Sequence, residues 1–107
     1  MDDKEFVGIL VRDILESNMI YYISLMNIEE GASLDEITNL FNNIPDESRN
    51  LLPSIIRRAI LDTISSVLGI LDGSSAAPDY RGDFELTYDN GPNLTGYLQD
   101  ILLNIDT

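Results

Sequence analysis

The sequence predicts a mainly α-helical protein with about four helices packed around a central helix at 54–72, and one short strand or extended segment near 83–88. Three observations lead to this fold class. The stretch 54–72 is apolar at helical spacing, the stretches 6–26 and 94–105 repeat that spacing, and only 83–88 alternates apolar and polar residues. At 107 residues the chain predicts a single helical domain, 1–107, with a flexible loop at 73–82.

The first helix is expected to begin at the acidic pair Asp2-Asp3, which suits the positive end of the helix dipole. Apolar residues then recur along one side from Phe6 to Leu15. The run 19–26 is apolar nearly all round and fits either a continuation of this helix or a short buried strand. We favour continuation, because no glycine or proline intervenes before Gly31.

A second helix is predicted by the capping box that runs from Ser33 to Glu36. Its apolar residues continue at helical spacing to about Asn43, and Pro45 ends it. A short turn then leads into the central helix.

The central helix carries an apolar arc over about two thirds of its circumference, far wider than the ~100° stripe of an ordinary surface helix. It should therefore have neighbours on several sides. Pro53 fits its first turn, and Gly73 is free to adopt the left-handed conformation that ends a helix.

Charged residues on this helix suggest structural ion pairs. Arg58 and Asp62 are four residues apart on the polar side. Arg57 falls inside the apolar arc, where it should snorkel, meet a carboxylate, or anchor a ligand in a cleft. The candidate carboxylate partners of Arg57 are Asp13, Glu16 and Asp100.

The chain changes character after Gly73. A small, polar loop at 73–82 precedes the alternating stretch 83–88, a turn at 89–93, and a final helix at 94–105. A lone strand cannot satisfy its own backbone groups. We therefore expect 83–88 to be either an extended segment packed by Phe84 and Leu86, or an edge that pairs across an interface.

Composition excludes several classes of function. The chain has no cysteine and no histidine, so it lacks thiolate chemistry and the commonest general base and metal ligand. We expect no metal and no cofactor. The net charge of −13 argues against direct contact with nucleic acid or anionic membranes, and favours a basic protein partner or solubility alone. The acidic start of the chain lacks the features of a signal peptide, which predicts a cytoplasmic protein.

The motifs in the chain are weak. The tripeptide Arg81-Gly82-Asp83 is interpreted as a chance match to the integrin-type motif. The run 89–93 is rich in oxygen ligands but lacks the spacing of a calcium loop. Carboxylates could support acid–base chemistry without histidine, but those around the alternating stretch fit a solvated acidic surface better.

The function predicted from these features is a small, acidic, non-catalytic module that binds a basic partner protein, as a bacterial immunity or antitoxin-like protein would. Tyrosines among acids between 79 and 89 resemble the composition of an interface. The residues expected to bind the partner are Asp79, Tyr80, Asp83, Glu85, Tyr88 and Asp89. The alternatives are a homo-oligomeric structural protein, which includes a homodimer, and an enzyme based on carboxylates.

Overall fold

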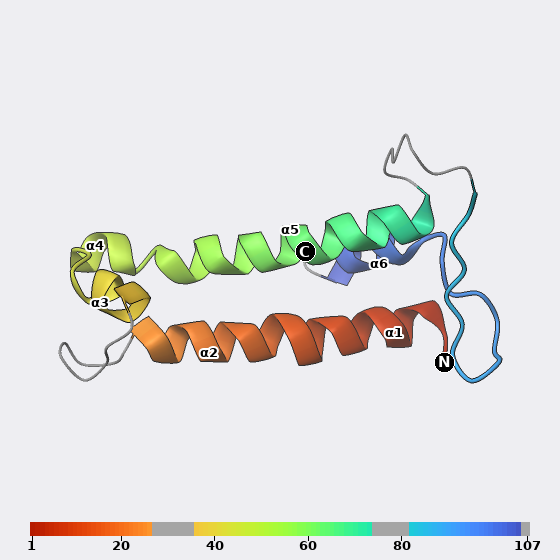
Figure 1. The fold of residues 1–107 in the computed structure, drawn as a ribbon, viewed down its shortest axis with the longest axis horizontal. Coiled ribbons are helices and arrows are strands. Elements are labelled where there is room, and N and C mark those ends of the chain that lie inside the picture. The colour runs from red at the N-terminus through yellow and green to blue at the C-terminus, as the bar shows by residue number, and fades with distance from the viewer. Residues whose placement is uncertain (27–35, 74–81, 106–107) are drawn as a thin grey trace.

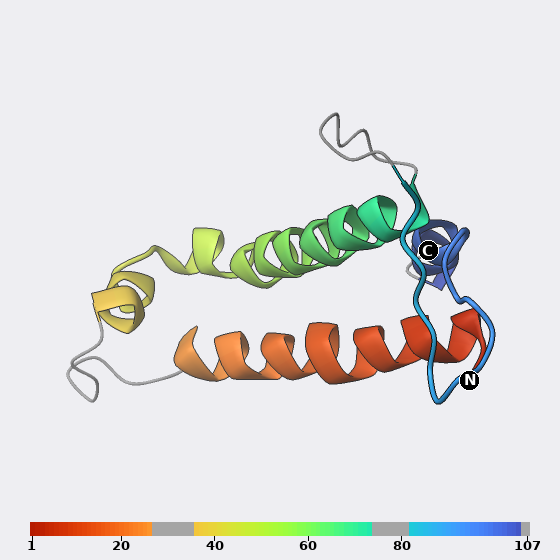
Figure 2. The same ribbon diagram turned by 45° about the vertical axis from the view of Figure 1, so that its right-hand side comes forward.

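The computed structural model describes residues 1–26, 36–73 and 82–105, and these residues are mainly helical (Figure 1). Three segments run without a break as one long rod: α1 (Asp3–Leu10), the π-helix η1 (Val11–Glu16) and α2 (Ser17–Met26). The short helices α3 (Glu36–Asn42) and α4 (Asp46–Arg49) lead into α5 (Leu52–Asp72). The last helix is α6 (Leu98–Ile105). The rod and α5 lie side by side, and α6 packs against both at one end (Figures 1 and 2).

The rod begins at Asp2, whose carboxylate accepts a hydrogen bond from the Glu5 N–H at 2.7 Å. Residues 19–26 are helical, which confirms that the first helix continues through them. The π-helical turns of η1 were not predicted, and they have a consequence for packing. In an unbroken α-helix, Val7 and Leu15 would point about 80° apart. The wider turns of η1 reduce that difference, so both residues reach the same core.

Helix α5 ends at the predicted residue, Asp72, and begins at Leu52, two residues earlier than predicted. Pro53 lies in its first turn, and Gly73 ends it in the left-handed conformation with φ 77°. Its burial is narrower than expected. Leu61, Ile64, Leu68 and Gly69 are buried, whereas other apolar residues of the same helix stay exposed. The neighbours of α5 therefore cover one strip of the helix, and only part of its broad apolar arc is buried.

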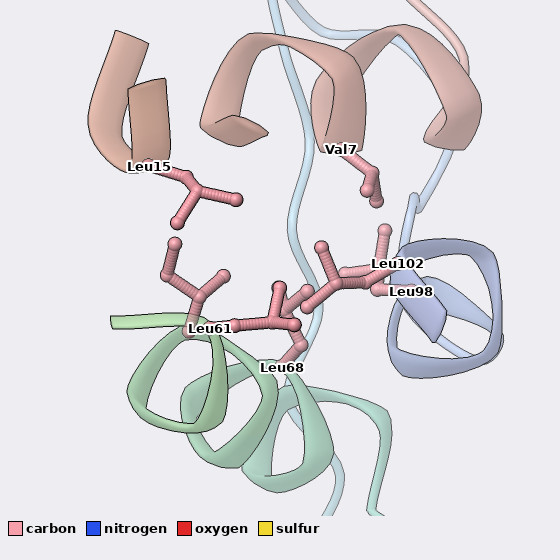
Figure 3. Packing of buried hydrophobic residues seen from close by; sticks show 7 residues of the cluster. Val7, Leu15, Leu61, Leu68, Leu98 and Leu102 are labelled. Carbon is pink, nitrogen blue, oxygen red and sulfur yellow. The ribbon is translucent and has the colours of Figure 1, made fainter. Parts of the chain in front are cut away.

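The core lies where the rod, α5 and α6 meet (Figure 3). Leucines dominate it, and each fully buried leucine contributes about 2–3 kcal/mol relative to its exposed state. The buried residues of this cluster are Val7, Leu15, Leu61, Ile64, Leu68, Leu98 and Leu102. The core is thus aliphatic and concentrated at the α6 end of the molecule.

Several finer expectations are not confirmed or fall outside the described residues. In the part of the chain that the structure describes, 83–87 forms no β-strand and is irregular. The last helix begins at Leu98, four residues later than predicted, and the count of four helices is not confirmed. The Ser33 cap and most of the 73–82 loop lie outside the described residues.

Among the described residues, no helix combines the length and the apolar character that crossing a bilayer requires.

Candidate functional site

The predicted binding residues converge on the segment 82–97, which crosses the end of the helical layers before α6 begins (Figure 2). Asp83, Glu85, Tyr88 and Asp89 all lie in it, and all four are exposed. The other two predicted residues, Asp79 and Tyr80, lie outside the described residues.

The tip of the segment is a tight turn. Asp89 and Asn90 both have positive φ, 51° and 60°, and the Gly91 N–H donates to the Tyr88 carbonyl at 2.9 Å. Two consecutive left-handed residues closed by this bond define a type I′ turn, which Asp and Asn tolerate better than most residues. A Cβ at Gly91 would lie 2.9 Å from the same carbonyl, so the turn requires glycine there. The turn holds Tyr88, whose side chain is 59% exposed, and the Asp89 carboxylate at adjacent positions.

The side chain of Asn93 holds the two arms of the segment together. Its Oδ1 accepts from the Leu86 N–H at 3.0 Å and from the Thr95 N–H at 3.1 Å. The Thr95 hydroxyl lies 2.9 Å from the same oxygen and 3.2 Å from the Phe84 carbonyl. The Leu94 N–H donates to the Leu86 carbonyl at 2.7 Å. These bonds fix the segment without a β-ladder.

Apolar and polar anchors attach this segment to the helices. Leu94 is buried and Leu86 packs on the core. At the end of α5, Asp72 accepts from the Gly96 N–H at 2.7 Å and from the Gln99 N–H at 2.8 Å. It thus caps the first turn of α6 from another helix. The Gln99 amide in turn donates to the Ser65 carbonyl at 3.0 Å.

A shallow hollow of about 380 Å³ lies between the end of α5 and this segment. Three acidic residues line it, Asp72, Asp83 and Glu85, together with Phe84 and Asn93. Within the described residues, no group of three or more acidic side chains is arranged to hold a metal ion. The hollow is therefore a negative recess whose outer rim is exposed to solvent.

The predicted ion-pair residues lie away from this segment. Arg58 Nε is 3.5 Å from a carboxylate oxygen of Asp62, and both side chains are largely exposed, so the pair adds little stability. Arg57 is also exposed, although it lies on the same line of α5 as Leu61 and Leu68. It borders a second groove, of about 450 Å³, that Glu16 also lines.

Asp13, one expected partner of Arg57, pairs with its own neighbour. Arg12 donates from Nε at 2.9 Å and from Nη2 at 3.2 Å to the two carboxylate oxygens of Asp13. These hydrogen bonds lower the pKa of Asp13 below its ordinary value.

The structure adds two groups of residues to the predicted binding set. Tyr97 is 70% exposed and Phe84 44% exposed, so the segment presents three aromatic rings with its acids. Asp72 positions the segment without any local sequence signal for that role, because its partners lie 24 and 27 residues away. Asn93 acts over shorter distances, on Thr95 two residues later and Leu86 seven residues earlier.

Comparison of the chain with family models, with curated proteins and with solved structures finds no match.

Proposed function

We propose that this protein is a non-catalytic, acidic binding module, and that the segment 82–97 docks on a basic protein. The observation that carries the proposal is a fixed backbone that displays exposed acids beside exposed aromatic rings. The acids are Asp83, Glu85 and Asp89, and the rings are those of Phe84, Tyr88 and Tyr97.

The hydrogen bonds of this segment support binding at low entropic cost. Asn93 and Thr95 hold the arms, and Asp72 fixes the start of α6. A preorganised segment loses little conformational freedom when a partner binds, so more of the contact energy remains as affinity. Tyrosine adds rigid contact area with a polar tip, which is why it is enriched at interfaces.

Electrostatics indicate the chemistry of the partner. A net charge of −13 attracts a basic surface over long distance and speeds association. The hollow beside Asp83 and Glu85 suits an arginine or lysine side chain of such a partner. An immunity or antitoxin-like protein, which covers the substrate groove of a basic enzyme, fits this description by size and charge.

The test is affinity capture from a lysate of the source organism at low salt, followed by mass spectrometry. The variant Asp83→Asn/Glu85→Gln/Asp89→Asn should lose on the order of tenfold in affinity for a captured basic protein, because its association is no longer steered. The matched control, Glu16→Gln/Glu47→Gln/Asp62→Asn, removes three exposed acids elsewhere. It should retain most of the affinity.

An equal loss in both triple variants would show that overall charge, and not the segment 82–97, determines binding. The proposal would be overturned if the wild type and both triple variants captured the same amount of partner, and if added salt did not reduce that amount.

A further inference from the structure

The tip of the segment 82–97 carries the dipeptide Asn90-Gly91. Asn90 is the one asparagine in the sequence that a glycine follows. It is exposed, and it is the second of the two left-handed residues of the type I′ turn, with φ 60°. The residue after an asparagine supplies a backbone nitrogen that can react with the asparagine amide. A glycine in that position has no side chain to hinder the approach, so Asn90 is the most reactive asparagine that the sequence contains.

The reaction is an intramolecular substitution whose only co-reactant is water. The Gly91 nitrogen loses its proton and attacks Cγ of Asn90, and a bond forms between these two atoms. The bond from Cγ to the side-chain nitrogen breaks, and this nitrogen leaves as ammonia with the proton that Gly91 lost. Water then opens the resulting succinimide ring at either of its two carbonyl carbons. The product is isoaspartate or aspartate, so a neutral amide becomes a carboxylate.

The type I′ turn holds both reacting groups in an unreactive arrangement. The Gly91 N–H donates to the Tyr88 carbonyl at 2.9 Å, so a hydrogen bond retains the proton that must leave. A type I′ turn also fixes ψ of its second central residue, here Asn90, at about 0°. Ring closure needs rotation about this bond, because the Gly91 nitrogen must move round toward Cγ. Asn90 therefore reacts only while the turn is open.

Opening the turn requires little change in the rest of the fold. The hydrogen bonds that hold the two arms together join Asn93 and Leu94 to Leu86, away from the tip. Asp89 and Asn90 are exposed, so no buried side chain has to leave the core. Backbone with few buried contacts and an exposed hydrogen bond opens locally at a small cost in free energy.

We propose that Asn90 is a self-modification site, at which the Gly91 nitrogen converts the side-chain amide to isoaspartate or aspartate when the type I′ turn opens. The step requires neither an enzyme nor the partner of the segment 82–97. Isoaspartate carries an additional methylene in the backbone, so the same turn cannot re-form between Tyr88 and Gly91. The modification is irreversible and adds a negative charge beside Asp89.

Peptide mass spectrometry measures the modification directly. The wild-type protein is incubated at constant pH and temperature, with and without denaturing urea, and fragmentation spectra locate each lost amide. Methylation by an isoaspartyl methyltransferase identifies the isoaspartate. The product should accumulate at Asn90 in both samples, and several-fold faster in urea, where the turn is lost. Asn93 is the internal control, because Leu94 follows it and its Oδ1 accepts two hydrogen bonds; it should stay intact.

Two substitutions at Asp89 test whether the turn controls the rate. Both remove the same carboxylate and leave Asn90 and Gly91 unchanged. Asp89→Gly permits the left-handed conformation without a steric penalty, whereas the β-branched side chain in Asp89→Val opposes it. Without urea, Asp89→Val should be modified at least about fivefold faster than Asp89→Gly. In urea both variants should react at the wild-type rate, because none of the three proteins then has the turn.

The proposal would be overturned by an Asn90 that stays intact in urea, or by a folded wild type that reacts as fast as the unfolded one. Equal rates without urea in the two Asp89 variants would overturn it as well, provided that circular dichroism shows both to be helical. If Asp89→Val failed to fold, the comparison of the wild type with and without urea would still decide.

Discussion

At the scale of single residues, Asp72 connects the end of α5 to the start of α6. It is the last residue of α5, yet its two carboxylate oxygens accept from Gly96 and Gln99 at 2.7 and 2.8 Å. A hydrogen bond to a charged acceptor contributes about 1.5–3 kcal/mol when its loss leaves the donor without a partner. This one side chain therefore fixes where α6 begins.

We expect Asp72→Ala to lower the free energy of unfolding by about 2–3 kcal/mol, because it removes both hydrogen bonds at once. Urea denaturation followed by circular dichroism measures the change. Asp62→Ala, on the same helix, removes an exposed carboxylate that pairs with the exposed Arg58. It should cost less than about 1 kcal/mol. Equal losses in the two variants would show that Asp72 does not cap α6.

At the scale of elements, α6 is amphipathic over only eight residues, and two adjacent leucines mark its two sides. Leu102 is completely buried in the core, and Leu103 is 50% exposed. A helix this short is not stable by itself in water, so its packing must hold it.

We expect Leu102→Ala to destabilise the protein by about 2–5 kcal/mol, because it leaves a cavity between α6, the rod and α5. Leu103→Ala should cost less than about 1 kcal/mol, since the side chain buries little. Thermal unfolding at one fixed protein concentration compares them. If Leu103→Ala proved the more harmful, α6 would be packed by its other face.

The elements also show what a sequence can predict. Pro53 and Gly73 are local signals, and they define α5 correctly. The start of α6 depends on Asp72, which lies 24 residues before Gly96, so helical spacing alone extends α6 too far toward the N-terminus. The alternation in 83–88 predicts a strand or an extended segment. The Leu86 N–H donates to the Asn93 side chain and the Leu86 carbonyl accepts from the Leu94 N–H, so neither group is left for a neighbouring strand. The exposure of Asp83, Glu85 and Asp89 follows from local composition. The hollow that Asp72 shares with Asp83 and Glu85 depends on tertiary contacts and could not be predicted.

At the scale of the whole molecule, charge is the dominant feature. The chain has 19 acidic and six basic residues, and its extents are 50 × 30 × 27 Å. At about 10 mM salt the Debye length is about 30 Å. It then matches the width of the molecule, so carboxylates on all its elements repel one another and oppose compaction.

We expect the unfolding temperature at pH 7 to rise by several degrees between about 10 mM and 1 M potassium chloride, as the Debye length shrinks to about 3 Å. Differential scanning calorimetry measures the shift. The control is the same titration near pH 4.1, the isoelectric point of the sequence, where self-repulsion is small and salt should have little effect. A fall in stability with salt at pH 7 would mean that attractive pairs, such as those of Arg12 and Arg58, outweigh the repulsion. The same salt should weaken the proposed binding of a basic protein to 82–97, because screening removes the long-range attraction between opposite charges.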